Sequence, residues 1–331
     1  MSRSADGLDP SSPSASAGTV LVTGGNGVQG GAMARRLLQE GFAVRAGVRS
    51  PARASTLAAA GAEIVACDLD DPAALRGACA GARAMVLSLP LEWERDRLLR
   101  WARQAGTAAR AAGVPLLVFN TSGRLPEHPS ELPGFEVRRA AEAVLRGVAP
   151  PMIVLRPPFF IDNLLNPAVA TGIARDGVVA YPLPERLRVS WLSVDDLGGY
   201  AAAALRHPEL AGRAFDVGGP AVLDGTGLAG AIAAGLGRPM RYLAIPPDVF
   251  ERGLAAHMPL AVARGIAASY FWIAQHADEP LFADTSCALD GALARPPTPV
   301  AAWAASAEAA LRPSRSSGQP APTTSSGPPT A

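Results

Sequence analysis

Nine consecutive residues decide the fold of this chain: Thr23-Gly24-Gly25-Asn26-Gly27-Val28-Gln29-Gly30-Gly31. They follow a β-prone run at residues 19–23 and open a helical stretch at residues 28–40. Glycines spaced Gly-x-x-Gly-x-x-Gly between a strand and a helix are typical of a dinucleotide-binding turn. Such a turn needs positive φ and free N–H groups for a pyrophosphate at the helix N-terminus. The alternative is a glycine-rich turn that holds no ligand.

Outward from this motif, strand-like and helix-like segments alternate as far as residue 157. Further apolar strands are predicted at residues 43–48, 63–66, 84–89, 116–119 and 152–155. Helices are predicted to begin at Ser50-Pro51 and Asp71-Pro72, and to cover residues 92–112 and 136–146. Apolar strands that alternate with helices indicate a parallel sheet covered on both faces. Right-handed crossovers make such a sheet doubly wound, so the fold class is α/β.

Beyond residue 157 the pattern loosens. Short strands are predicted at residues 178–181, 189–192 and 214–217, with helices at 195–206 and 226–236. Residues 247–294 are mostly helical and unusually apolar, which suits a lobe that covers a substrate and equally suits plain helix packing. We therefore expect a dinucleotide-binding Rossmann core over residues 18–157. A smaller, mostly helical substrate lobe over 158–312 is interleaved with the last Rossmann elements.

The two ends differ in composition from the rest of the chain. Residues 1–17 and 313–331 are rich in Ser, Ala and Pro, which predicts disordered tails. The N-terminal stretch lacks the apolar region of a secretory signal, and no apolar run reaches the length of a membrane span. Three scattered cysteines fit a reducing compartment. These features predict a cytoplasmic protein and leave its oligomeric state open.

The charged residues exclude several classes of function. The 331-residue chain has 30 Lys+Arg against 29 Asp+Glu, and all of its basic side chains are Arg. The near-zero net charge argues against a nucleic-acid partner. Without lysine there is no P-loop phosphate site, no Schiff base on the chain's own amine and no Tyr-x-x-x-Lys pair.

The end of the second predicted strand bears on the choice of cofactor. An NAD site places Asp or Glu there, to accept a hydrogen bond from the ribose 2′-OH. This chain has Arg49, with Arg53 one turn further on. Guanidinium groups suit a 2′-phosphate through charge-assisted bonds. The pattern favours NADPH, and the alternative is a surface arginine.

Five separated motifs resemble one family. Besides the nonamer and the strand that ends at Arg49, they are Asp68-Leu69, the run Leu155-Arg156-Pro157-Pro158-Phe159-Phe160-Ile161-Asp162-Asn163, and the run Trp191-Leu192-Ser193-Val194-Asp195-Asp196-Leu197-Gly198. Together they resemble the NmrA-like branch of atypical short-chain dehydrogenases over about residues 19–280. The family includes NADPH-dependent quinone, dye and carbonyl reductases, polyketide-tailoring ketoreductases, and redox sensors without known turnover.

The resemblance implies a set of cofactor-binding residues along the strand ends. They are Gly24, Asn26, Gly27, Val28, Gln29, Gly30, Arg49, Arg53, Asp68, Leu69, Ser88, Leu89, Pro90, Asn120, Thr121, Arg138, Pro158 and Phe159. Asp68 and Leu69 are expected to meet the adenine. No metal site is expected, because the histidines show no metal-ligand spacing.

The set of expected catalytic residues is incomplete. Ser122 offers a hydroxyl after the fifth strand, but Phe135 stands in the region of the usual catalytic tyrosine and cannot donate a proton. Arg138 most nearly matches the lysine that binds the nicotinamide ribose in many relatives, and it is a poor general acid. Asn163 is expected to face the nicotinamide pocket by resemblance, or else to cap a helix. The predicted catalytic residues are therefore Ser122, Arg138 and Asn163.

Two functions remain open at this point. A reductase of this kind needs a hydrophobic acceptor that requires little acid help, such as an aromatic quinone, a polarised enone or a polycyclic ketone. Positioning and NADPH then supply most of the rate. The alternative is a non-catalytic NADP(H)-binding sensor or regulator.

Overall fold

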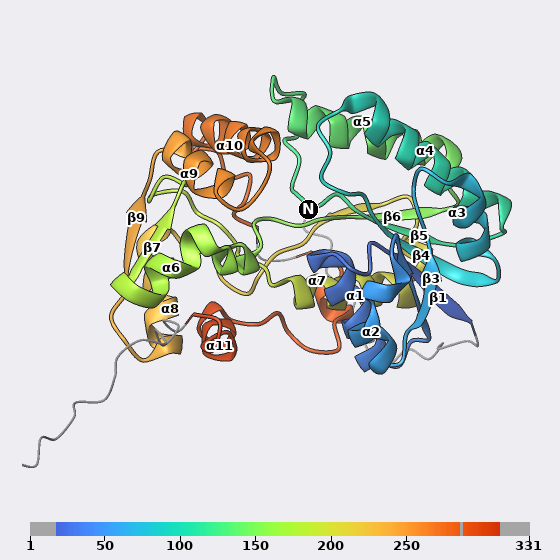
Figure 1. The fold of residues 1–331 in the computed structure, drawn as a ribbon, viewed down its shortest axis with the longest axis horizontal. Coiled ribbons are helices and arrows are strands. Elements are labelled where there is room, and N and C mark those ends of the chain that lie inside the picture. Colours follow the sequence, from blue (N-terminus) through green and yellow to red (C-terminus); the bar gives the residue numbers. More distant parts are fainter. Residues whose placement is uncertain (1–17, 285–286, 312–331) are drawn as a thin grey trace, which may run out of the picture.

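A computed structural model describes residues 18–284 and 287–311 of the chain. The tails predicted at 1–17 and 313–331 lie outside the described residues. The described part forms a seven-stranded sheet flanked by helices and a second lobe around a two-stranded sheet (Figure 1).

The large sheet is parallel throughout, as the sequence predicts. Its strands in spatial order are β3 (Glu63–Ala66), β2 (Val44–Val48), β1 (Thr19–Thr23), β4 (Ala82–Ser88), β5 (Leu117–Asn120), β6 (Met152–Arg156) and β8 (Ala214–Asp216). The chain runs outward in one direction from β1 to β3 and in the other from β4 to β8. The order therefore reverses between β1 and β4, and ligands of open α/β sheets bind outside the strand ends at such a point.

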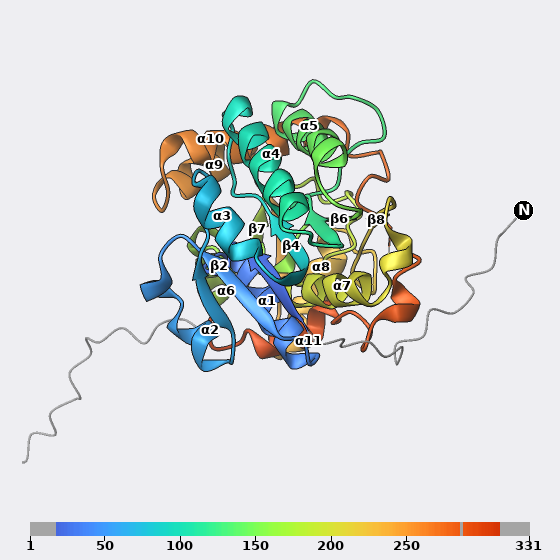
Figure 2. The ribbon, with the colours of Figure 1, turned by 90° about the vertical axis from the view of Figure 1, so that its right-hand side faces the viewer.

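Alternate residues of the central strand enter two different cores. Val20 and Val22 join the core beneath α1 (Val28–Gln39) and α7 (Val194–Arg206). Leu21 points the other way, into the core of α3 (Pro72–Cys79), α4 (Arg95–Ala111) and α5 (Pro133–Val148). Figures 1 and 2 show these two helical layers on opposite faces of the sheet. This arrangement is the predicted doubly wound fold. The short elements η1 (Pro51–Arg53) and α2 (Ser55–Ala59) join β2 to β3.

The second lobe has its own apolar core, formed mainly by residues beyond 158. Its strands β7 (Val178–Tyr181) and β9 (Arg241–Ala244) pair in parallel. Its helices are α6 (Pro167–Asp176), α8 (Gly225–Leu236), α9 (Pro247–Ala255), α10 (Leu260–Gln275) and α11 (Val300–Ser306). Single-turn helices occur at η2 (Ile161–Leu165), η3 (Pro208–Leu210) and η4 (Asp290–Ala292). In Figure 1, α10 stands beside the start of α5, on the side of the sheet where the strands end.

Two local predictions need correction. Residues 189–192 form isolated bridges, from Val189 to Leu223 and from Leu192 to Phe160, instead of a strand. The helix predicted from residue 92 begins at Arg95, because the Glu94 carboxylate accepts hydrogen bonds from the first turn and caps it.

Side chains also set the starts of other helices. Ser193 caps α7, and Asp195 pairs with Arg36 at 3.0 Å. Asp71 caps α3 as expected, whereas Asp70 binds side chains of α4.

None of the helices in the described part of the chain has the length and apolar character needed to cross a membrane.

Candidate cofactor and acceptor site

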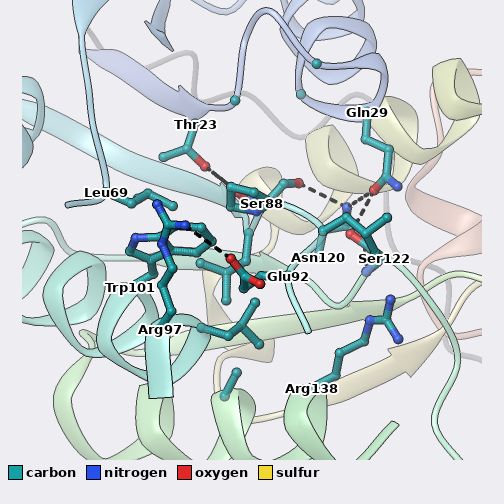
Figure 3. Close-up of a pocket in the computed structure, with 18 of the residues that line it drawn as sticks. Thr23, Gln29, Leu69, Ser88, Glu92, Arg97, Trp101, Asn120, Ser122 and Arg138 are labelled. Atoms are coloured by element: carbon teal, nitrogen blue, oxygen red, sulfur yellow. Dashed lines mark hydrogen bonds and ion pairs between the residues drawn. The ribbon is translucent and has the colours of Figure 1, made fainter. Parts of the chain in front are cut away.

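A single large cavity opens at the point where the strand order reverses. It measures about 1090 Å³ and is lined by the carboxyl ends of β1 to β5, the starts of α1 and α5, and part of α10 (Figure 3). Its lining includes sixteen of the predicted cofactor residues: Gly24, Asn26, Gly27, Val28, Gln29, Gly30, Arg49, Arg53, Asp68, Leu69, Ser88, Leu89, Pro90, Asn120, Thr121 and Arg138. Ser122 also lines it.

The glycine turn has the geometry that an anion needs. Gly24 has φ +69°, a conformation that L side chains rarely adopt. A Cβ atom on Gly30 would overlap the carbonyls of Thr23 and Gly24, so only glycine lets α1 pack this close to β1. Gly27 caps α1 without a side-chain bond, and the first turn contains no acidic residue. Its N–H groups can therefore hold a pyrophosphate.

Two arginines flank this turn at the end of β2. Arg49 and Arg53 are exposed and line the cavity. Within residues 18–284 and 287–311, neither guanidinium has a hydrogen-bond or ion-pair partner. Asn26 donates a hydrogen bond to the Ser50 carbonyl over 3.1 Å and ties the turn to the same loop. Both arginines are thus available to a phosphate placed beside the glycine turn.

A charged cluster forms the wall beyond β3. Asp70 accepts hydrogen bonds from Arg97 at 3.0 Å and from the Trp101 indole at 2.8 Å. These bonds lower the pKa of the Asp70 carboxyl. The Arg97 guanidinium lies 4.7 Å from the centre of the Trp101 ring. Beside them, Leu69 is buried and presents an apolar surface to the cavity (Figure 3). This wall suits a flat ring such as adenine.

The centre of the cavity is a network of neutral polar groups. Thr23 Oγ1 bridges β1 to β4 by accepting from the Ser88 N–H at 3.0 Å. Asn120 Nδ2 donates to Ser88 Oγ at 3.0 Å and to Gln29 Oε1 at 2.6 Å. Ser122 Oγ donates to the same Gln29 oxygen at 3.0 Å (Figure 3). Gln29 therefore connects the glycine motif to the predicted catalytic serine.

Arg138 approaches this network from α5 (Figure 3). Its guanidinium donates a hydrogen bond to the Gly134 carbonyl of its own helix, at 2.8 Å. Burial lowers the pKa of its guanidinium, because desolvation disfavours the charged form. Phe135 does not face the cavity: it is buried in the second lobe, edge-on to Trp272 at 5.1 Å. The residue in the usual tyrosine region therefore serves packing.

Three predicted residues lie outside the lining. Pro158 is buried, and the Phe159 ring packs against Tyr270 at 5.8 Å and Phe282 at 4.8 Å. Asn163 lies in η2 beside the hydroxyl of Tyr181. These residues pack within the second lobe, and their contact with the cofactor stays a prediction.

Several residues of the lining were not predicted as part of the site. Glu92, Trp93, Arg97 and Trp101 come from the loop after β4 and the start of α4, and Gly265, Ala268 and Ser269 come from α10. Trp93 was not singled out because the helix was predicted from residue 92, which places this side chain within the helix, whereas the structure places it in the loop ahead of the cap at Glu94.

Metal chemistry finds no support in the part of the chain that the structure describes: no group of three or more His, Cys, Asp or Glu side chains there could hold an ion. Cys67 lines the cavity, and burial raises the pKa of its thiol to about 12. This cysteine is therefore a protonated wall residue near neutral pH and not a nucleophile.

Comparison with known proteins agrees with this geometry. The model of the NmrA-like family matches residues 16–304. An NAD(P)H azoreductase of Xenophilus azovorans is 33% identical over 227 residues, which are 68% of this chain and 77% of that protein. A (4-alkanoyl-5-oxo-2,5-dihydrofuran-3-yl)methyl phosphate reductase of Streptomyces griseus is 32% identical over 76% of this chain and 85% of its own length.

Among solved structures, the triphenylmethane reductase of Citrobacter sp., complexed with NADP(H), has the same fold. It superposes with a TM-score of 0.71 at 22% identity and covers 87% of this chain and 99% of its own.

Proposed function

Because the chain belongs to the NmrA-like family, we propose that it is an NADPH-dependent reductase that transfers hydride to a hydrophobic aromatic quinone or ketone. The observation that carries the proposal is the cavity at the reversal of strand order. It combines an uncapped helix N-terminus, two arginines and an apolar wall. A polyketide-tailoring ketoreductase is one enzyme of this kind.

Different residues of the chain bind different parts of the cofactor. The first turn of α1 holds the pyrophosphate, Arg49 and Arg53 hold the 2′-phosphate, and Leu69 with the Arg97–Trp101 pair holds the adenine. Arg138 holds the nicotinamide ribose or polarises an acceptor oxygen. When bound, NADPH supplies the hydride. The choice of NADPH rests on guanidinium groups at the position where an NAD site has a carboxylate.

The choice of acceptor rests on what the cavity lacks. No tyrosine, histidine or lysine is among the described residues of its lining. The Ser122 hydroxyl donates a hydrogen bond to Gln29, and Arg138 keeps its protons near neutral pH. An acceptor that needs a strong acid at its oxygen is therefore disfavoured. A quinone or polarised enone, which delocalises the developing charge, suits the site.

The regulator alternative has less support. Two curated relatives above 30% identity are named as reductases, and the cavity lining extends beyond the predicted cofactor residues to α10. Calorimetric titration with NADPH and NADH tests the cofactor. A panel of quinones, azo dyes and polycyclic ketones, followed by NADPH absorbance, tests turnover. Tight NADPH binding with every acceptor inert favours the regulator.

A further inference from the structure

Trp93 is an aromatic side chain that the binding roles proposed so far leave unused. It lies in the loop between β4 and α4 and lines the cavity, yet 40% of its surface is exposed. The loop leaves β4 at Ser88, whose side chain belongs to the polar network around Gln29. A large exposed indole inside a ligand cavity is a surface on which a flat ring can stack.

The loop holds Trp93 in a defined place. The Glu92 carboxylate accepts hydrogen bonds from the Trp93 N–H at 2.8 Å and the Glu94 N–H at 3.0 Å. The same carboxylate meets Arg97 at 3.5 Å. These bonds hold the backbone of the loop at Trp93, from which the indole projects.

On α10, the missing side chain of Gly265 leaves space for this ring. A Cβ atom on Gly265 would overlap Nε1, Cε2 and Cδ1 of Trp93. Ala268 and Ser269, one turn further along α10, also line the cavity and are small. The indole edge therefore rests against bare backbone, and the small side chains beside it leave space over α10. The contact joins the second lobe to the Rossmann core at the mouth of the cavity.

We propose that Trp93 is the residue on which the acceptor stacks, and that Gly265 is the notch that sets its position. This inference rests on the proposed reductase function and narrows its substrate class to flat, conjugated ring systems. A compact aliphatic acceptor gains little from an indole surface, whereas a naphthoquinone or a polycyclic ketone can cover it face to face.

Two acceptors and three variants test the stacking role. In Trp93→Ala, KM for a neutral naphthoquinone should rise about tenfold through lost ring contact and buried area, whereas KM for a small cyclic aliphatic enone stays within about twofold. Trp93→Phe should recover most of the loss. Phe271→Ala is the matched control, because Phe271 is an exposed aromatic of α10 outside the cavity lining. An unchanged naphthoquinone KM in Trp93→Ala, or equal losses for both acceptors, overturns the inference.

The role of Gly265 in positioning Trp93 has its own test. Gly265→Ala places a methyl group where the indole lies, so it should raise the naphthoquinone KM in the wild-type background. In the Trp93→Ala background the same substitution should change little, because the clashing ring is gone. An equal effect of Gly265→Ala in both backgrounds shows that Gly265 does not act through Trp93 and overturns its role.

A binding measurement separates this inference from the proposed function. Equilibrium dialysis of the naphthoquinone is run against the full-length protein saturated with NADP⁺, where no turnover occurs. If binding is lost in Trp93→Ala while the wild type reduces no acceptor, the stacking site stands and the reductase proposal fails. If the wild type turns over and Trp93→Ala binds the quinone equally well, the reductase proposal stands and the stacking site fails.

Discussion

The hydroxyl of Ser122 donates a hydrogen bond to Gln29 Oε1 over 3.0 Å. Ser122 is also the non-glycine residue with positive φ, +59°, among the described residues. In ordinary short-chain dehydrogenases the matching serine orients the carbonyl of the substrate. Here its proton is directed at a side chain from the cofactor-binding turn. In this structure the serine therefore joins α1 to the end of β5, and its role toward a substrate stays a prediction.

Gln29→Leu should weaken both the fold and NADPH binding. The substitution removes the acceptor of two hydrogen bonds and leaves Asn120, which is 1% exposed, with one unsatisfied amide hydrogen. Such a loss costs about 1–3 kcal/mol of unfolding free energy. Chemical denaturation and NADPH titration measure the two effects. Gln39→Leu, at an exposed position of the same helix, is the control, and a loss of equal size there contradicts the role of Gln29.

Arg49→Asp should discriminate between the two nicotinamide cofactors. A hydrogen bond to a charged group contributes about 1.5–3 kcal/mol, so NADPH affinity should fall about tenfold to a hundredfold while NADH affinity changes little. Calorimetry with both cofactors gives the answer. Arg76→Asp makes the same change of charge on the exposed face of α3, away from the cavity. Equal losses for NADPH and NADH in Arg49→Asp rule out a contact with the 2′-phosphate.

Two glycine-to-alanine substitutions should move stability in opposite directions. Gly30→Ala forces a methyl group into the carbonyls of Thr23 and Gly24 and should separate α1 from β1, with loss of NADPH binding. Gly77 lies inside α3, where a Cβ atom would meet nothing within 4 Å. Gly77→Ala should therefore raise the unfolding free energy by about 0.5–1 kcal/mol through helix propensity. Thermal unfolding of both variants measures the two changes in stability. Destabilisation of equal size in both variants would contradict the prediction.

The pH profile of kcat/KM should show no titration of a catalytic tyrosine. With a naphthoquinone that does not ionise, kcat/KM should stay level between about pH 7 and 9, because carboxylates and arginines titrate outside this range. Burial raises the pKa of Cys67 to about 12. Burial also lowers the pKa of Arg138, so its charge, present at low pH, is lost as pH rises, earlier than for an exposed arginine but still beyond this range.

Arg138→Lys should add an alkaline limb to the same profile. Burial lowers the pKa of a lysine below its usual value of about 10.4, so the charge disappears at a lower pH than in the wild type. Arg139→Lys is the matched control, because Arg139 bonds the carbonyls of Pro126 and His128 outside the cavity lining. Steady-state rates measured across pH give both profiles. An alkaline limb below pH 9 in the wild type would contradict the prediction, because it would require a proton donor that is not among the described cavity-lining residues.

The local pattern was sufficient to predict the parallel sheet and the cofactor end of the site. Strand–glycine–helix order fixes where β1 ends and α1 begins, and Arg49 follows β2 directly. Strands buried on both faces carry a strong apolar signal. β9 was missed because it is short and three of its four residues are exposed, so neither apolar alternation nor length marks it.

Contacts between segments that are distant in the chain could not be predicted from the sequence. No periodicity links Trp93 to Gly265, because their contact depends on how the second lobe closes over the sheet. The same closure decides that Phe135 packs against Trp272 and that Phe159 packs against Tyr270. Family resemblance gave Phe159 as a cofactor contact and Asn163 as a residue of the nicotinamide pocket. The lobe packing that decides where both lie is not encoded locally in one sequence.

The most direct test of the central proposal is anaerobic mixing of the purified protein with NADPH and a naphthoquinone, followed by the near-ultraviolet absorbance of NADPH. The prediction is oxidation of one NADPH for each quinone reduced, faster than without protein, and much slower with NADH. Tight binding of NADPH with no oxidation above the protein-free rate, for every quinone, azo dye and polycyclic ketone offered, contradicts a reductase and leaves a cofactor-binding regulator.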